Sequence, residues 1–545
     1  MPRSALFSSL LRMARDQAIA VRKNVSLATV ADWRVEEAER TRVGGGLSRR
    51  RFLAGSGAAA ATLLAPRLVH AAAASPRIAI VGGGIAGLSC ALELADRGLA
   101  STVYEANQRL GGRMYSNVDY FNDGQITEWY GELIDTNHRT IRRLARRFGL
   151  DILDVKQAEP AGSEDTFYFF GKYYPRAQAN KDFQAVHQEL KAAIQGAGYP
   201  TTYNLSTAVG RALDNTSVYD WIDQHVPGGH GSPMGALLDA AYVEELAVST
   251  QLQSSLNLIY LLGFNATPGN FEIYGKSDER FRIAGGNQQL PAAIASYLGA
   301  STVKTGWRMT SIARTADGRF TLSFDLPSTS RTVVADYVVL CIPFAILRGL
   351  DYTGAGFDAR KDFAIQNLGA GKSGKLQLQF NSRLWNAPGP WPGVSNGNSY
   401  ADTGFQGTWD VTRGQTGQSG ILVDYTGGPV AAAMATATAN AVAGDAGVDA
   451  DAQQFLARLH PVFPGVAAAW NGKAASSLPH LDPYLMLSYS HWKTGQYQTI
   501  AGYEQVRQGN CLFAGEHTSI DFQGFMEGGA VSGERAANEV LADLK

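Results

Sequence analysis

Cysteine, net charge and long apolar runs are all scarce in this sequence, and each shortage excludes a class of protein. Only three cysteines occur among 545 residues, Cys90, Cys341 and Cys511, which are too few and too scattered for a disulfide framework or a metal site. The formal net charge is −1, so the chain lacks the basic excess by which proteins hold nucleic acids. No run of about 18 or more apolar residues occurs, so we predict no membrane span and no stable membrane anchor.

The N-terminal segment has the features of a targeting signal rather than of a folded core. Residues 48–53 read SRRRFL, an alanine-rich run follows over residues 54–64, and small residues occupy positions 71–74. Paired arginines, a weakly apolar run and an Ala-x-Ala-like end are typical of a twin-arginine export signal. We therefore predict a leader over residues 1–75, the twin-arginine export machinery as a partner, and a periplasmic or secreted protein. The alternative is an alanine-rich leader with no targeting role.

The strongest local pattern lies in residues 77–105, RIAIVGGGIAGLSCALELADRGLASTVYE. An apolar run at 78–81 predicts a buried parallel strand, and residues 88–95 predict a helix. Between them stand three glycines in GxGxxG spacing, Gly82, Gly84 and Gly87. A second apolar step ends at Glu105, 18 residues after the last glycine, close to the spacing of about 20 expected in a dinucleotide-binding fold.

The chemistry of a dinucleotide explains this spacing. The first glycine permits a tight turn, the second lets the backbone approach a pyrophosphate, and the third lets the helix lie close to the strand. Free N–H groups at the start of the helix would bind the diphosphate, and Glu105 would accept hydrogen bonds from a ribose. The alternative is a glycine-rich turn that holds no ligand, but strand, turn, helix and acid all agree on a nucleotide.

The residues that follow carry a family resemblance. Residues 104–113, YEANQRLGGR, resemble the segment after the dinucleotide fold in the flavin-containing amine oxidases, the monoamine and polyamine oxidase group, to which L-amino acid oxidases are related. The resemblance implies that the cofactor is FAD and that Arg113 lies near its diphosphate. The family often has another basic residue where this chain has Asn107.

A second matching segment, residues 129–135, is similar to the part of the family that passes over the flavin ring, and implies that Gly131 and Glu132 contact the cofactor. By the same resemblance, residues 281–290 return the chain to the FAD domain, and Met309 lies against the adenine, where relatives carry a small aliphatic residue.

The amino acid oxidases of this superfamily grip the substrate carboxylate with an arginine in the segment over the flavin. This chain has Leu133 and Ile134 there. The lack of this arginine favours an amine over an amino acid as substrate, although His138 or Arg139 could bind the carboxylate instead.

A strand pattern at residues 374–380 begins near a lysine, Lys375. The resemblance implies that Lys375 is the family lysine that holds a water against flavin N5 and assists reoxidation by O2. An ammonium group there would stabilise developing negative charge. The alternatives are a solvated lysine at a strand end and an assignment of the family role to Lys372.

Residues 489–497, YSHWKTGQY, are similar to another family segment, and the resemblance makes Tyr497 one wall of an aromatic sandwich that guides the amine. Phe525 occupies the second wall, where many relatives carry tyrosine. In monoamine oxidases the residue before the first tyrosine is a cysteine bonded to the flavin. Here it is Gln496, so we predict noncovalent FAD.

The C-terminal stretch is the clearest family match. Residues 512–518 predict a strand that ends at an acid, Glu516, and residues 524–537 begin a helix. The resemblance places Glu516 near the ribityl or phosphate region and lets Met526 donate through its backbone. A helix N-terminus aimed at the flavin would stabilise negative charge on the reduced ring.

These observations predict an α/β fold with a Rossmann-like FAD-binding domain and a discontinuous α+β substrate domain. We expect the FAD-binding domain to comprise residues 76–139, 275–348 and 503–545. Residues 140–274 and 349–502 would form the substrate-binding domain. A homodimer is one assembly that the sequence allows.

The predicted function is oxidation of an amine to an imine, which water hydrolyses to an aldehyde or ketone plus ammonia or an amine, with O2 reduced to H2O2. Three alternatives stay open: an L-amino acid oxidase whose carboxylate clamp lies elsewhere, a dehydrogenase that passes electrons to a protein carrier, and a FAD-binding protein without amine chemistry.

Overall fold

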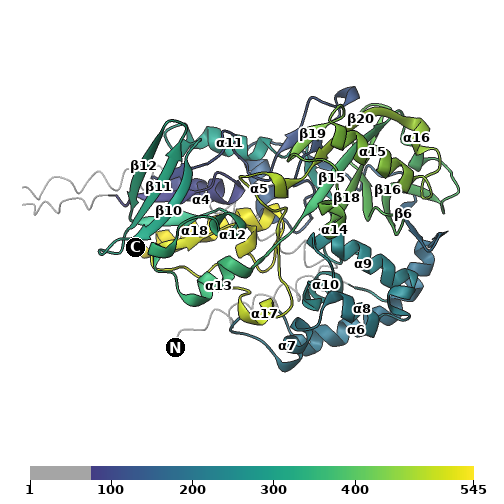
Figure 1. Ribbon diagram of the computed structural model, residues 1–545, viewed down its shortest axis with the longest axis horizontal. Coiled ribbons are helices and arrows are strands. Elements are labelled where there is room, and N and C mark those ends of the chain that lie inside the picture. Colours follow the sequence, from purple (N-terminus) through teal and green to yellow (C-terminus); the bar gives the residue numbers. More distant parts are fainter. Residues whose placement is uncertain (1–74, 265) are drawn as a thin grey trace, which may run out of the picture. The chain divides into compact units, whose positions relative to one another are not determined.

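The computed structural model describes residues 75–264 and 266–545 (Figure 1). The predicted twin-arginine signal and all but the last residue of the predicted leader lie outside these residues. Residues 75–545 form one compact unit. Among the described helices, none combines the length and the apolar character needed to cross a membrane.

A five-stranded sheet carries the glycine motif. Its strand order is β22-β13-β1-β2-β9, and every neighbouring pair is parallel. Ile80 is fully buried and pairs with Val339 on one side and Val103 on the other, as expected for short apolar strands covered on both faces. The strands are β1 (Ile78–Val81), β2 (Thr102–Tyr104), β9 (Val303–Lys304), β13 (Tyr337–Leu340) and β22 (Cys511–Phe513).

Two helices from opposite ends of the described chain lie side by side against this sheet. They are α4 (Ile85–Asp96), which follows β1 directly, and α18 (Met526–Asp543) (Figure 1). A Cβ added at Gly533 would lie 2.1 Å from the carbonyl oxygen of Ala86, so the two helices touch backbone to backbone. Helix α11 (Gln289–Leu298) also packs on α4.

The second half of the molecule is built on an eight-stranded sheet of order β19-β20-β15-β18-β17-β16-β6-β7. Its central strand β15 is buried along its whole length. Leu376, Leu378 and Phe380 lie on one face in an apolar cluster, whereas the alternate positions on the other face carry buried polar side chains, Lys375 among them. The strands are β6 (Ser163–Phe169), β7 (Lys172–Tyr173), β15 (Ser373–Phe380), β16 (Val394–Ala401), β17 (Gly407–Asp410), β18 (Gly420–Gly427), β19 (Asn440–Val442) and β20 (Trp470–Ser477).

Helices cover this sheet: α9 packs against β16 and β18, and α15 packs against β15 and β20. Several of the helices begin at a side-chain cap; Ser217, for example, accepts the Asp220 N–H at the start of α8, and Ser232 caps α9 with Pro233 at its first position. The helices of this half are α6 (Arg176–Ala197), α7 (Ala208–Asp214), α8 (Val218–His225), α9 (Pro233–Leu246), α10 (Ser255–Gly263) and α15 (Ala446–Leu459).

Shorter elements complete the described fold. A three-stranded antiparallel sheet comprises β10 (Arg308–Arg314), β11 (Phe320–Leu326) and β12 (Thr329–Ala335). The remaining helices and strands include β3 (Ser116–Asn117), β4 (Thr127–Glu128), α5 (Arg139–Arg147), β5 (Ile152–Asp154), β8 (Phe281–Ile283), α12 (Phe344–Leu347), α13 (Ala359–Asn367), β14 (Gly369–Ala370), β21 (Ser490–His491) and α17 (Gln496–Thr499).

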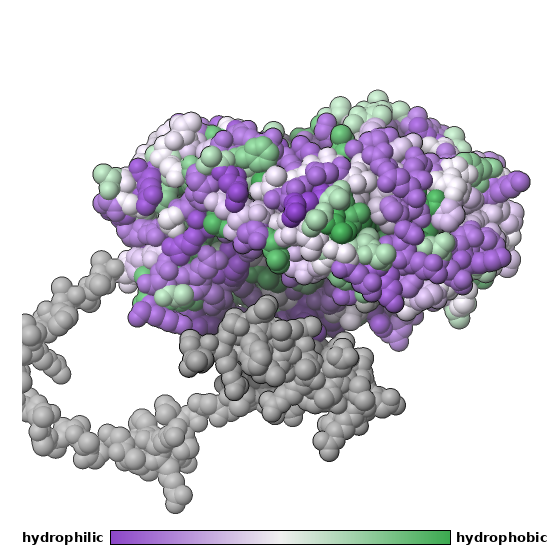
Figure 2. Space-filling view, turned by 90° about the horizontal axis from the view of Figure 1, so that it is seen from below, coloured by the Kyte–Doolittle hydropathy of each residue, from purple (hydrophilic) through white to green (hydrophobic). Residues whose placement is uncertain are grey.

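The predicted α/β fold class is confirmed. The five-stranded sheet takes its strands from the two ends and the middle of the described chain, and the eight-stranded sheet takes its strands from the segments between them. The residue boundaries of the two domains stay a prediction. The face seen in Figure 2 is mostly hydrophilic, with hydrophobic side chains in small separate groups.

Candidate active site

One cavity of about 450 Å³ lies between these elements and brings most of the predicted site residues together. This volume is within the range of small-molecule sites. Lys375 and Phe525 line it, as do nine of the ten residues predicted to bind the cofactor: Gly82, Gly84, Glu105, Arg113, Gly131, Glu132, Met309, Glu516 and Met526.

The glycine motif forms the turn from β1 into α4. Gly82 has φ of +107°, which favours glycine. Gly87 lies inside α4 and does not line the cavity; a Cβ there would be 2.0 Å from the carbonyl oxygen of Gly82. Gly84 precedes the helix, has no atom closer than 4.0 Å to an added Cβ, and leaves the first N–H groups of α4 without a side-chain cap. These features fit a diphosphate at the helix N-terminus.

Glu105 lies beside this turn. Its Oε2 accepts the Gly83 N–H at 2.6 Å and its Oε1 accepts the Asn107 N–H at 2.7 Å. Burial raises the pKa of the carboxyl group. Lone pairs remain on both oxygens, so Glu105 could also accept a ribose hydroxyl.

Arg113 and Glu516 join two segments that are 403 positions apart. Arg113 Nη1 donates to Glu516 Oε1 at 2.8 Å and to the carbonyl oxygen of Ser488 at 2.9 Å. The other oxygen of Glu516 accepts the Gly524 N–H at 2.9 Å. Burial opposes the charge on Glu516, but Arg113 outweighs it and holds the pKa below its usual range. The pair therefore keeps a charged arginine at the cavity wall.

The N-terminus of α18 forms part of the same wall. Phe525 stands at the N-cap position without a side-chain cap, and Phe525 and Met526 both line the cavity. The nearby acid Glu527 does not cap its own helix, because its two oxygens accept the N–H groups of Thr140 and Ile141, each at 2.8 Å, at the start of α5. A second helix N-terminus with free donors is thus available to a ligand.

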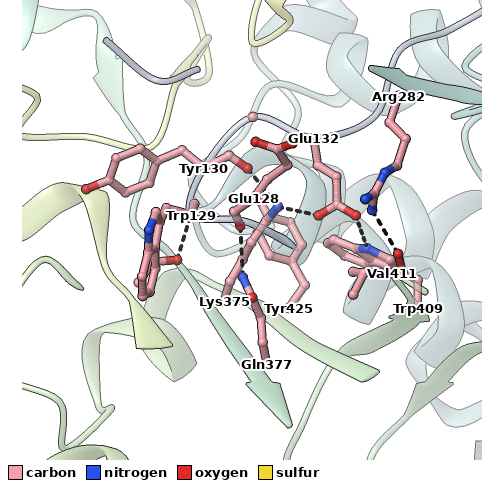
Figure 3. A network of polar contacts seen from close by, with 12 residues as sticks. Glu128, Trp129, Tyr130, Glu132, Arg282, Lys375, Gln377, Trp409, Val411 and Tyr425 are labelled. Atoms are coloured by element: carbon pink, nitrogen blue, oxygen red, sulfur yellow. Dashed lines mark hydrogen bonds and ion pairs between the residues drawn. The ribbon is translucent and has the colours of Figure 1, made fainter. Parts of the chain in front are cut away.

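Lys375 lies at the centre of a buried polar network (Figure 3). Its Nζ donates to Glu132 Oε2 at 2.9 Å and to the carbonyl oxygen of Tyr130 at 2.7 Å. Trp409 Nε1 donates to the other oxygen of Glu132 at 3.1 Å. Burial would raise the pKa of Glu132, but the ammonium of Lys375 holds it below its usual range. Lys372, the competing candidate, is exposed and does not line the cavity.

Aromatic side chains surround this lysine. Its Nζ lies 5.2 Å from the ring centroid of Trp409 and 5.9 Å from that of Tyr425. The hydroxyl groups of Tyr425 and Tyr489 are 2.9 Å apart, and all three rings line the cavity. Trp409 and Tyr425 lie on β17 and β18, where Tyr425 pairs with Lys375 across the sheet, and no local sequence pattern marks them.

The expectation for Tyr497 is not met. This tyrosine is buried in α17, its ring lies 4.5 Å from that of Trp492, its hydroxyl donates to Asn257 Oδ1 at 3.0 Å, and it does not line the cavity. Tyr489, which lies next to Gly524, lines the cavity instead. Both tyrosines belong to one sequence segment, and spacing alone does not distinguish them. The residue before Tyr489 is Ser488, which likewise cannot form a thioether to a flavin.

Neither substitute for the carboxylate clamp faces the cavity. His138 is buried; burial lowers its pKa to about 3, so the ring is neutral, and its Nδ1 accepts the Asp135 N–H at 3.0 Å. Arg139 is exposed at the start of α5. Within residues 75–264 and 266–545, the Lys and Arg side chains that line the cavity are Arg109, Arg113, Arg308 and Lys375.

Comparisons with known proteins agree with this geometry. The family described as "Flavin containing amine oxidoreductase" matches residues 85–541. The L-amino-acid oxidases of Pseudechis australis and Naja atra are each 25% identical to this chain, over 86% and 85% of it and 87% of their own lengths.

Solved structures share the fold. Cyclohexylamine oxidase from Brevibacterium oxydans IH-35A has a TM-score of 0.72 at 18% identity, over 86% of this chain and 99% of its own. A putrescine oxidase double mutant has a TM-score of 0.70 over the same shares and at the same identity.

The fold and the cavity define a flavin-dependent oxidoreductase. The chain belongs to the flavin-containing amine oxidoreductase family, and its cofactor is FAD.

Proposed function

We propose that this protein is an FAD-dependent amine oxidase. Two hydrogens leave the C–N bond of a neutral amine to give an imine, water hydrolyses the imine to an aldehyde or ketone plus ammonia or an amine, and O2 takes up the two electrons and two protons as H2O2. Bound FAD supplies the two-electron chemistry. The observation that carries the proposal is the meeting of a buried lysine, aromatic walls and two uncapped helix N-termini in one cavity.

Each group has a role in this proposal. The residues proposed to hold FAD noncovalently are Gly82, Gly84, Gly87, Glu105, Arg113, Gly131, Glu132, Met309, Glu516 and Met526, with Gly87 acting through the helix turn. Tyr489 and Phe525 would orient the amine, and an apolar aromatic wall favours its neutral form. Lys375, held by Glu132, would place a positive charge where O2 is reduced.

An L-amino acid oxidase is the second candidate, because the curated relatives at 25% identity carry that name. The cavity argues against it: the segment that would hold a carboxylate clamp contributes Leu133, and neither His138 nor Arg139 lines the cavity.

The substrate class can be tested by anaerobic reduction of the bound flavin. Primary amines, polyamines and matching L-amino acids are mixed with the purified holoenzyme, and flavin absorbance is followed. We expect amines to bleach the flavin and acid precipitation to release all of it, because no cysteine precedes Tyr489. Bleaching by amino acids alone would establish the second candidate, and slow reoxidation in air would indicate a dehydrogenase.

A matched pair of variants tests which tyrosine acts on the substrate. Tyr489→Leu should lower the rate of flavin reduction on the order of tenfold or more by removing a wall that orients the amine. Tyr497→Leu should instead lower the free energy of unfolding by about 2 to 4 kcal/mol, since it removes a packed ring and the hydrogen bond to Asn257. Stopped-flow reduction and thermal unfolding measure the two effects; the reverse assignment would restore Tyr497 to the site.

We also propose export by the twin-arginine pathway. The support is the SRRRFL sequence at residues 48–53 followed by an alanine-rich run, and this pathway carries proteins that have already folded around a cofactor.

A further inference from the structure

Two carboxylates of the cavity have no cationic partner. Glu245 stands in the last turn of α9, and Glu279 precedes β8; both line the cavity. Within residues 75–264 and 266–545, neither carboxylate forms a hydrogen bond or an ion pair, although the backbone N–H of Glu279 donates to Asp135 Oδ1 at 2.9 Å. An acid in the last turn of a helix also opposes the helix dipole. Among the described residues, the fold therefore holds two cavity acids whose carboxylates have no ion-pair partner.

The two acids repel each other. Burial, and Glu279 after it, raise the pKa of Glu245 well above the usual range. Burial is also the main cause that raises the pKa of Glu279, to about 7. Burial and mutual repulsion thus disfavour the ionised forms of both acids, and a bound cation would favour them.

The remaining groups around the pair are also mostly acidic. Asp135 and Glu132 raise the pKa of Glu279, and only Lys156 and Arg413 lower it. Arg413 already forms an ion pair with Glu159, with 2.5 Å between its Nη1 and Glu159 Oε1. Glu244, next in sequence to Glu245, is 3% exposed, does not line the cavity and leaves Oε2 without a partner among the described residues.

The pair belongs to the part of the cavity around Lys375. Burial is the main cause that raises the pKa of both Tyr425 and Tyr489, and the negative charge of Glu245 raises both further. The Tyr489 hydroxyl donates to the carbonyl oxygen of Glu244 at 3.0 Å. Glu245 thus stands beside the aromatic walls and Glu279 near Glu132, which already pairs with the ammonium of Lys375.

We propose that Glu245 and Glu279 bind a second cationic group of the substrate, an ammonium or guanidinium at the end of an alkyl chain whose other end carries the amine that is oxidised. This assignment rests on the proposed function and specifies its substrate class. An amine without a second charge would leave the two acids buried and unpaired, whereas a distal cation would gain charge-assisted hydrogen bonds to both. Diamines and basic amino acids share this chemistry.

Matched substrates test the proposal on the holoenzyme. 1,5-Diaminopentane is compared with pentylamine, and L-lysine with L-norleucine, by anaerobic flavin reduction and by calorimetric binding to the oxidised enzyme. We expect the compound with the second cation to bind more tightly on the order of 10- to 100-fold, the effect of buried hydrogen bonds to charged groups. The diamine arm and the amino acid arm separate the two sources of the cation.

Glutamine variants locate the effect. Glu245→Gln and Glu279→Gln should each reduce the preference for 1,5-diaminopentane over pentylamine about tenfold or more. Glu244→Gln is the matched control and should keep the preference, because this buried acid lies outside the cavity lining. In the wild type the preference should increase from about pH 6 to about pH 8 as Glu279, whose pKa is about 7, ionises, and Glu279→Gln should flatten that rise.

Equal affinity of the wild type for the matched compounds would overturn the proposal, as would glutamine variants that weaken both compounds alike. If no amine and no amino acid reduces the flavin, the proposed function fails on its own. The calorimetric comparison then still decides whether the two acids bind a cation.

Discussion

Replacement of Lys375 with methionine should slow reoxidation of the reduced enzyme by O2 on the order of 100-fold or more, while FAD stays bound. The ammonium group is the cation that faces the aromatic walls at the centre of the cavity. Loss of one preorganised charge or donor at a reacting centre costs on the order of 100- to 1000-fold in rate. Anaerobic reduction followed by stopped-flow mixing with O2 measures the rate directly.

The same substitution has a structural consequence that must be separated from the chemical one. Lys375→Met leaves Glu132 buried beside Trp409 without its cation, and breaking a buried pair costs about 3 to 5 kcal/mol. The double variant Lys375→Met with Glu132→Gln removes both charges and should recover part of the lost stability in urea unfolding.

The double variant should nevertheless remain as slow with O2 as the single one. Recovery of the reoxidation rate together with stability would show that Lys375 acts only by holding the structure. An FAD-bound single variant with wild-type turnover would remove the lysine from the mechanism altogether.

Two glycines of the nucleotide turn, Gly87 and Gly84, should have different effects when each is replaced by alanine. At Gly87 the added Cβ would lie 2.0 Å from the carbonyl oxygen of Gly82, so strand and helix must separate. Overpacking of this kind costs typically 1 to 3 kcal/mol and more against rigid backbone. Gly87→Ala should therefore yield unstable protein that loses FAD.

Gly84→Ala should behave differently, because its nearest neighbour would be 4.0 Å away. We expect a folded protein with normal unfolding of the apoprotein but FAD affinity lowered about tenfold or more, since the methyl group would occupy the path of the pyrophosphate. Gly231→Ala, with open space around its Cβ and no positive φ, serves as the control. Thermal unfolding of the apoprotein measures the loss of stability, and fluorimetric FAD titration measures the loss of cofactor affinity. Equal destabilisation of the apoprotein by Gly84→Ala and Gly87→Ala would contradict the separate roles expected for the two glycines.

The nucleotide half of the site was predictable because its information is local. The three glycines and Glu105 lie within one strand–helix–strand unit, so their spacing alone places them around one turn. Arg113 and Glu516 were predicted separately from two matching motifs, and the structure joins them in an ion pair.

The substrate half was less predictable because strand pairing assembles it. Tyr425 faces Lys375 only through the register of β15 and β18, and Trp409 joins them from a third strand. The choice between Tyr489 and Tyr497 depends on which side chain the surrounding helices bury, and that is a tertiary property. The same holds for Glu245 and Glu279, which lie 34 positions apart in the sequence and carry no motif.

The pairing of Arg113 with Glu516, and of α4 with α18, sets the order of events during synthesis. The nucleotide turn emerges from the ribosome early, but the wall that completes it belongs to α18, which follows far later in the sequence. A growing chain that has not yet reached Glu516 and α18 lacks one wall of the cofactor cavity. Flavin capture should therefore follow the synthesis of Glu516 and α18, however early the glycine turn itself has formed.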